Sequence, residues 1–357
     1  MNVRAAVLSF VALASLWFLP PSLGALELRE GLVRLELDEE AGSFSLYYLA
    51  DIAANRYVPL FFDQDPETSG TAVLDGNQFH RLGASGGFSL ETRRTREGGR
   101  FMWTSGSIEV IQDFSFVASR GSRLANGVQI VTTVANRSEE TRNIGLRILL
   151  DTTLGEAQPA HFLVDGEEEV TRETSVSSAR YWVSPSANTP GLGLRYSLRG
   201  DGVSRPDRVV FANWKRLVES SWDYAVRESR TFSLLPYSIN DSAAAMYYGP
   251  RRVAPDERFT VVSVMGSAGS GSFAATQGSQ GPLESLFRDT TEEGRITSGG
   301  SLEEEVVAVN DLLAEIDEIL SQEGGPSEED VEVVRRIYEE LRRRAETTRS
   351  GPGDRSQ

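Results

Sequence analysis

Alternation of apolar and polar residues constrains the fold of this 357-residue chain more than any other feature. It runs from Leu26 to about Met265. Examples are Leu35–Leu37, Ile108–Val110 and Leu146–Ile148. A period of two places successive side chains on opposite faces of an extended strand. Each alternating segment therefore predicts a strand with one face buried and the other in water.

Short turn signals separate these segments, as expected for antiparallel neighbours. They include Asp75-Gly76-Asn77, Glu97-Gly98-Gly99 and Asp165-Gly166. Many strands at close spacing, with few helical patterns between them, predict a mainly β fold: a large antiparallel β-sandwich over residues 26–265. Residues 213–222 depart from the alternation and fit either a short helix lying on a sheet or a twisted strand pair.

The composition changes after the strand-rich region. Residues 266–300 are rich in Gly and Ser and predict a linker. Over residues 301–348 the apolar period becomes helical, with a Gly324-Gly325-Pro326 break between two heptad stripes. This pattern predicts an acidic C-terminal α-helical hairpin of the coiled-coil type, followed by a disordered tail at residues 349–357.

Two short helices bury too little surface to be stable alone, so the hairpin needs a further contact surface. That surface is either the β domain of the same chain or another protomer or protein. The candidate docking residues are the apolar positions Val309, Leu313, Ile316, Leu320, Val334, Tyr338 and Leu341.

The first 25 residues have the layout of a cleaved secretory signal peptide. Arg4 precedes an apolar run that ends at Pro20-Pro21, and small residues follow up to Ala25. The alternative is an uncleaved anchor, but the run is shorter than the roughly 20 residues that a spanning helix needs. We therefore expect a periplasmic or secreted protein with no integral membrane span after cleavage.

Composition excludes several classes of function. The chain has no cysteine, which removes disulfides and thiolate metal sites. Its net charge of -16 disfavours nucleic acids and anionic lipid surfaces. No phosphate-binding loop, dinucleotide fingerprint or metal-ligand motif is present. We therefore predict no cofactor and no metal.

A few polar residues are candidates for chemistry, each with a structural alternative. His80 and His161 could form an acid–base pair, but nothing in the sequence places them together. Asp151 ends a strong strand, and such a carboxylate more often caps a turn than takes part in catalysis. Residues 63–70 have the alternating oxygens of a calcium loop without its glycine and terminal glutamate, so a solvated turn is favoured.

Aromatic residues are concentrated between positions 181 and 248. With neighbouring acids they could bind a sugar, since Trp and Tyr faces stack on sugar rings while carboxylates bind hydroxyls. The alternative is a core of large aromatics beneath a sheet. The candidate ligand-binding residues are Trp182, Trp214, Trp222, Asp223, Tyr224, Asp241 and Tyr247.

The segment from Val131 to Gly155, with Asn136-Arg137-Ser138 and Gly145-Leu146-Arg147 followed by Asp151, resembles part of a group of uncharacterised exported bacterial proteins of the spirochaete type. Such proteins look like large β-sandwiches similar to the galactose-mutarotase-like supersandwich. The resemblance implies architecture and an envelope location. It implies no catalytic residues, because neither histidine lies in a sequence that fits the mutarotase pattern.

Two functions are compatible with these features. The first is a periplasmic scaffold or interaction protein without catalytic activity, which uses the helical hairpin for docking or assembly with a protein partner. The second is a carbohydrate-binding or carbohydrate-active protein, which uses an aromatic-lined face of the sandwich.

Overall fold

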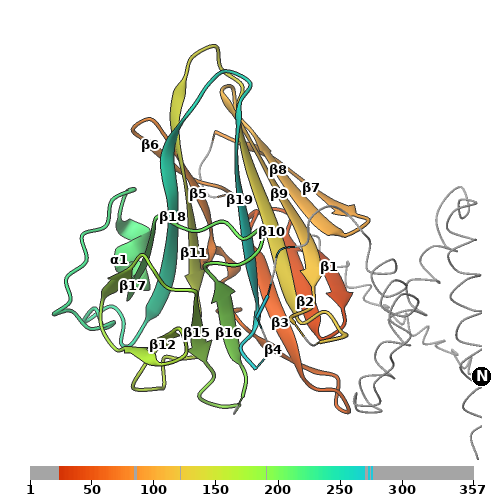
Figure 1. Ribbon diagram of the computed structural model, residues 1–357, viewed down its shortest axis with the longest axis vertical. Coiled ribbons are helices and arrows are strands. Elements are labelled where there is room, and N and C mark those ends of the chain that lie inside the picture. The colour runs from red at the N-terminus through yellow and green to blue at the C-terminus, as the bar shows by residue number, and fades with distance from the viewer. Residues whose placement is uncertain are drawn as a thin grey trace, which may run out of the picture.

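The computed structural model describes residues 24–83, 87–120, 122–189, 191–269, 272–273 and 275. In this part of the chain the strands form three sheets (Figure 1), and all their pairings are antiparallel. The predicted mainly β, antiparallel architecture is therefore confirmed. The predicted hairpin at residues 301–348, the tail at 349–357 and almost all of the predicted signal peptide lie outside the described residues.

The three sheets differ in size, and in the two larger ones neighbouring strands are often far apart in the chain. From edge to edge, the four-stranded sheet consists of β1 (Ala25–Glu30), β2 (Val33–Asp38), β3 (Phe44–Asp51) and β4 (Arg56–Pro59). In the same sense, the nine-stranded sheet consists of β13 (Glu168–Val170), β12 (Phe162–Val164), β15 (Tyr181–Pro185), β16 (Gly193–Ser197), β19 (Arg258–Ser267), β10 (Gly127–Asn136), β9 (Ile108–Val117), β8 (Gly98–Thr104) and β7 (Ser89–Thr95). The six-stranded sheet consists of β14 (Thr174–Val176), β17 (Arg208–Asn213), β18 (Ser242–Val253), β11 (Arg142–Asp151), β5 (Gly70–Asp75) and β6 (Gln78–Arg81).

The nine-stranded and six-stranded sheets share the main hydrophobic core. Buried polar contacts also join them. The hydroxyls of Tyr196 on β16 and Tyr248 on β18 lie 3.1 Å apart. Gln112 Nε2 on β9 donates to the hydroxyl of Thr71 on β5 at 2.9 Å. Because buried polar groups need partners, these contacts fix how the two sheets face each other.

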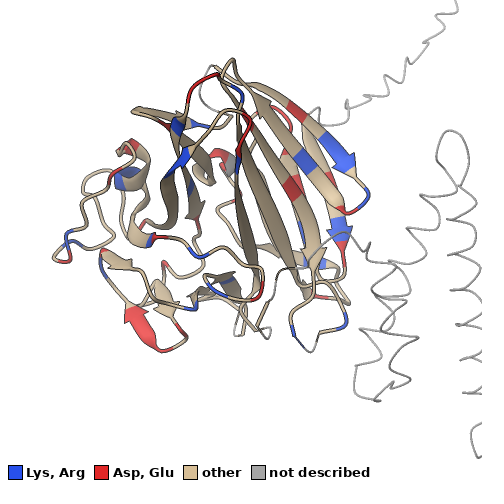
Figure 2. Ribbon diagram, turned by 45° about the horizontal axis from the view of Figure 1, so that its top comes forward, with Lys and Arg blue, Asp and Glu red and all other residues tan. Residues whose placement is uncertain are grey.

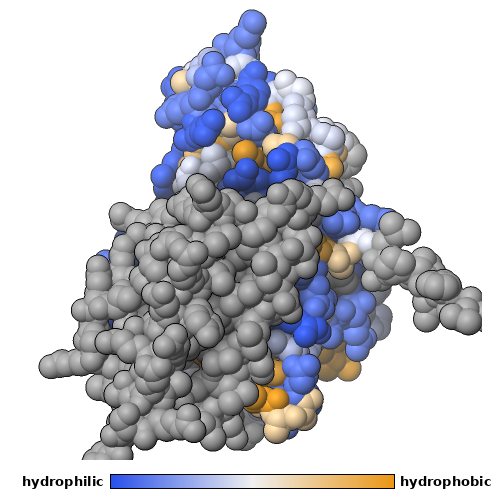
Figure 3. Space-filling model, turned by 90° about the vertical axis from the view of Figure 1, so that its right-hand side faces the viewer, coloured by the Kyte–Doolittle hydropathy of each residue, from blue (hydrophilic) through white to orange (hydrophobic). Residues whose placement is uncertain are grey.

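Positions of charged residues are coloured along the outer strands of the nine-stranded sheet (Figure 2). Arg100 on β8 and Asp113 on β9 form a half-exposed ion pair across neighbouring strands. Figure 3 shows another side of the molecule. The part of its surface that is coloured by hydropathy is largely hydrophilic, with small apolar patches between the polar residues. This polar-out arrangement is the physical basis of the alternation in the sequence.

A short helix covers the outer face of the six-stranded sheet. It is α1 (Trp214–Glu219), and the side chain of Asn213 caps its first turn by accepting from the backbone N–H of Arg216. Leu217 is fully buried in a second, smaller core against β17 and β18. Buried Arg147 on β11 donates to the carbonyl oxygens of Leu217 at 3.3 Å and Ser221 at 3.2 Å. Of the two alternatives for residues 213–222, the helix is correct.

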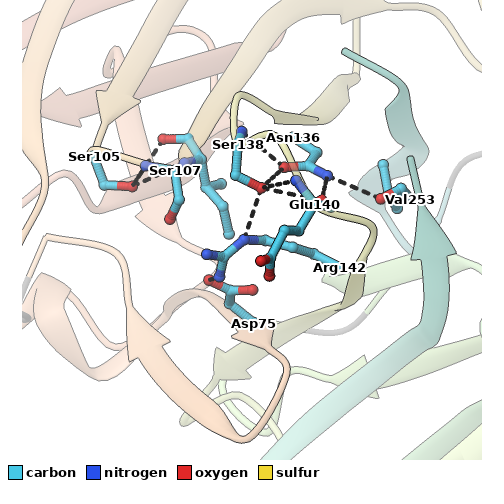
Figure 4. Close-up of polar contacts among 9 residues, drawn as sticks. Asp75, Ser105, Ser107, Asn136, Ser138, Glu140, Arg142 and Val253 are labelled. Atoms are coloured by element: carbon cyan, nitrogen blue, oxygen red, sulfur yellow. Dashed lines mark hydrogen bonds and ion pairs between the residues drawn. The ribbon is translucent and has the colours of Figure 1, made fainter. Parts of the chain in front are cut away.

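The segment that carries the sequence resemblance builds the turn between β10 and β11 (Figure 4). Asn136 Nδ2 donates to the carbonyl oxygens of Glu140 at 2.7 Å and Val253 at 2.9 Å. Arg142 Nε donates to Ser138 Oγ at 3.0 Å, and the guanidinium forms an ion pair with Asp75. Asn136, Ser138 and Arg142 are therefore occupied in holding this turn.

The end of the β domain differs slightly from the expected boundary at Met265. β19 continues to Ser267. Beyond it, buried Phe273 packs in a small cluster with Val117 and Val264. Some of the residues expected in the linker therefore complete the sandwich.

Candidate functional site

The aromatic residues singled out in the sequence do not share one exposed face. Trp182 is fully buried in the main core and stacks on Tyr196 with the ring planes 2° apart. Trp222, Tyr224 and Tyr247 are buried beside α1 in the second core. Their strand and loop positions point inward, so their rings have no open face for a sugar. An aromatic-lined sugar face made of these four side chains is not found in the structure.

Three other candidates remain at the surface. Asp223 is exposed, whereas Trp214 and Asp241 are half-buried. Trp214 and Asp241 lie together, because the backbone N–H of Trp214 donates to the carbonyl oxygen of Asp241 at 3.3 Å. The tryptophan Nε1 donates to the carbonyl oxygen of Thr68 at 2.9 Å. Trp214 thus links the loop before β18 to the 3-10 helix η1 (Pro66–Thr68).

Asp241 belongs to a cluster of three carboxyl groups with Asp151 and Glu156. One carboxylate oxygen from each lies within 4.8 Å of the others. Asp151 ends β11 and Asp241 directly precedes β18, and these antiparallel neighbours pair Asp151 with Ala243. The end of one strand and the start of the other therefore meet at the same sheet edge. The loop after β11 brings Glu156 to that edge.

Burial keeps this carboxylate cluster partly protonated at neutral pH. It raises the pKa of Asp151 from its ordinary value of 3.8 to about 7, opposed by a hydrogen bond with Thr68. It also raises the pKa of Glu156 to about 7, opposed by the backbone N–H of Ser242. The pKa of Asp241 rises for the same reason, opposed by hydrogen bonds from Ser238 and Asn213. Asp151 is buried, while Glu156 and Asp241 are partly exposed, so the cluster is partly open to solvent.

Asn213 and His161 hold the surroundings of the cluster in place. Asn213 Nδ2 donates to the carbonyl oxygen of Asp241 at 2.9 Å and to Ser238 Oγ at 3.0 Å. His161 Nδ1 lies 2.8 Å from Ser242 Oγ, and the backbone N–H of Ser242 donates to Glu156 Oε1 at 3.0 Å. Burial lowers the pKa of His161 to about 4, so the imidazole is neutral near pH 7.

The two histidines do not form a pair. His80 lies on edge strand β6 and packs edge-on against Phe88, while His161 lies against Phe232. The calcium-like segment at residues 63–70 is a turn in which Asp65 caps η1 through its side chain. Both observations agree with the structural alternatives expected from the sequence.

The carboxylate cluster can act in two chemical ways. A carboxyl with a pKa near 7 donates or accepts a proton at neutral pH, and two such groups side by side suit acid–base chemistry or hydrogen bonding to hydroxyls. Three carboxylate oxygens at this spacing are also suitable ligands for a hard divalent cation. Glu156 was missed in the sequence, although its place five residues after Asp151, in the loop that follows β11, was an available signal.

Comparisons with known proteins found solved structures of low similarity. No family model matches the chain, and no curated protein sequence matches it. A galactose mutarotase related enzyme from Lactobacillus acidophilus is 9% identical, with a TM-score of 0.39 over 71% of this chain and 100% of that one. The Slr1438 protein from Synechocystis sp. PCC 6803 is 12% identical, with a TM-score of 0.41 over 68% and 95%. The 4-alpha-glucanotransferase from Thermococcus litoralis is 8% identical, with a TM-score of 0.38 over 68% and 37%.

At this level of similarity the likeness carries no information about the site.

Among the described residues, none forms a helix that is both long enough and apolar enough to span a bilayer.

Proposed function

We propose that this protein binds a carbohydrate at the cluster of Asp151, Glu156 and Asp241. The observation that carries the proposal is that this partly open cluster holds two carboxyl groups with pKa values near 7. Sugar hydroxyls both donate and accept hydrogen bonds, and a carboxyl near its pKa can match either role. The half-buried ring of Trp214 beside the cluster adds apolar surface.

The same groups are suited to move a proton on a bound sugar. A protonated carboxyl can donate to a ring or glycosidic oxygen while its ionised neighbour accepts a proton. Glu156 is the better placed donor, because it is partly exposed and the backbone of Ser242 orients one of its oxygens. Asp151 is more deeply buried, and the charges of Asp241 and Glu156 add to the effect of burial in raising its pKa.

Isothermal titration calorimetry of the protein at pH 7 against neutral and amino sugars and their oligomers tests the proposal. We expect binding that Asp241→Asn weakens at least roughly tenfold, because a charge-assisted hydrogen bond to a hydroxyl is lost. Asp256→Asn is the matched control. Asp256 is exposed in the turn between β18 and β19, far along β18 from the cluster.

Two results would contradict this function. The first is wild-type protein that binds none of the sugars, and the second is an equal effect of the two variants. Binding of Ca²⁺ alone, with no sugar binding, would instead assign the cluster to a cation.

The scaffold function and the export of the chain are separate proposals that rest on the sequence. The heptad stripes in residues 301–348 support docking or assembly, and residues 1–25 support export to the periplasm or secretion. Light scattering coupled to size-exclusion chromatography, on the chain and on a version that ends at Gly281, tests the first. A higher-order species that becomes monomeric on truncation supports assembly through the hairpin. An unchanged mass contradicts self-assembly through it.

A further inference from the structure

Three large apolar side chains project into solvent from one short loop before β18. Leu235 is 72% exposed, and Tyr237 and Ile239 are each 73% exposed. All three lie within five residues, at and just after a tight turn. We refer to Leu235, Tyr237 and Ile239 as the apolar tip. Exposed apolar side chains that gather in this way mark a contact surface.

The apolar tip is held by hydrogen bonds at its base. The backbone of Leu234 pairs with that of Ser238 on both sides of a tight turn, with N···O distances of 2.9 and 3.0 Å. Arg216 on α1 donates to the carbonyl oxygen of Ser233 at 2.8 Å. The backbone N–H of Asn240 donates to Ser233 Oγ at 3.0 Å. A contact surface that is already ordered loses little conformational entropy on binding.

The apolar tip is linked to the carboxylate cluster through Ser238. Ser238 directly follows Tyr237, and its hydroxyl accepts from Asn213 at 3.0 Å and hydrogen bonds to the carboxyl of Asp241. Tyr237 of the apolar tip is therefore the direct chain neighbour of Ser238, which contacts the cluster through Asp241.

The charge of the protein limits which glycans can bind at the cluster. The cluster carries three carboxyl groups, and the net charge of the protein is -16. The Nζ of Lys215 lies 5.7 Å from the ring centre of Tyr237, but Lys215 is already paired with Glu219. An anionic sugar would meet like charge at the cluster, which costs binding energy.

We propose that the apolar tip is a second subsite for a glycan of two or more units that carries no negative charge. Its terminal sugar enters the carboxylate cluster, and the following sugars lie on the ring of Tyr237 and its apolar neighbours. This inference rests on the proposed carbohydrate function and names its ligand class.

Calorimetry with glucose and N-acetylglucosamine, and with β-1,4-linked oligomers of each, tests the subsite. We expect wild-type protein to bind oligomers more tightly than the single sugars. Tyr237→Ala should reduce oligomer affinity roughly tenfold and leave the affinity for single sugars unchanged, since an aromatic contact is lost only outside the cluster. Tyr57→Ala, at a half-buried position on β4 in another sheet, is the control and should change neither.

Several outcomes would overturn the inference. Oligomer binding that Tyr237→Ala leaves intact removes the tip from the site but keeps the carbohydrate function, whereas no glycan binding by the wild type removes both. If the anionic oligomer oligogalacturonate binds as tightly as the neutral oligomers, the proposed preference for glycans without negative charge is wrong. An effect of Tyr237→Ala on oligomeric state, or on binding to phosphatidylcholine vesicles, without an effect on glycans would assign the tip to a protein or a lipid surface.

Discussion

Asp151 offers a direct test of the electrostatics of the cluster, because burial makes its ionised form unfavourable. The residue is 5% exposed, and burial raises its pKa from 3.8 to about 7. Between these values the native carboxyl keeps a proton that the unfolded chain has released. Raising the pH through this window therefore lowers the free energy of unfolding. The pKa difference corresponds to a loss of about 4 kcal/mol once the pH exceeds 7.

We expect Asp151→Asn to remove this loss. At pH 4 the native carboxyl is protonated and resembles an amide, so the variant and the wild type should unfold with similar free energies. At pH 8 the variant should be more stable by up to about 4 kcal/mol. Glu156 titrates in the same range, so the variant keeps part of the pH dependence.

Urea unfolding followed by tryptophan fluorescence at pH 4, 5.5, 7 and 8 measures the difference. Asp256→Asn serves as the control, because it removes the same charge from an exposed turn and should show no such pH dependence. The reasoning is refuted if the stability difference between Asp151→Asn and wild type is the same at pH 4 and pH 8, or if the variant is the less stable protein at pH 8.

Three further predictions concern the core, a buried ion pair and a turn, all measurable by urea unfolding. Trp182→Ala should cost about 3 to 5 kcal/mol, because a fully buried ring leaves a cavity; a loss below about 1 kcal/mol would contradict its core position. Glu173→Gln should cost about 3 kcal/mol, since buried Glu173 pairs with Arg216 at 2.8 Å and an uncompensated guanidinium would remain; an unchanged midpoint would show that water compensates it. Gly83→Ala should cost about 2 kcal/mol or more, because φ is +88° and the added Cβ would lie 1.6 Å from the carbonyl oxygen of Ala41; a neutral effect would show that this turn yields easily.

Much of the fold could be predicted because its signal is local. The two-residue period reports which segments are extended, and β9, β10 and β11 all lie within the predicted strand region. What this period cannot report is which surface covers each face. The sequence predicted the same role for Trp182 and Trp214. In the structure Trp182 is fully buried between sheets, whereas Trp214 is half-exposed at the start of α1.

The candidate site was only partly visible in the sequence for the same reason. Asp151 was noticed as a strand-end carboxylate and Asp241 as a candidate ligand-binding residue, with nothing to bring the two together. They become neighbours because β11 pairs with β18, a contact between segments that lie far apart in the chain. Glu156 belongs to no sequence motif, and it became a candidate only because the structure places it beside Asp151 and Asp241. Similarly, nothing local marked the apolar tip, because exposure depends on what else folds over a loop.

The sequence by itself determined the β class, the positions of the turns and the acidic character of the protein, since these follow from residue periodicity and composition. Only the tertiary structure decided which aromatic rings are buried and which carboxyl groups meet. Long-range strand pairing sets those distances, and the burial that it produces raises the pKa values of the cluster.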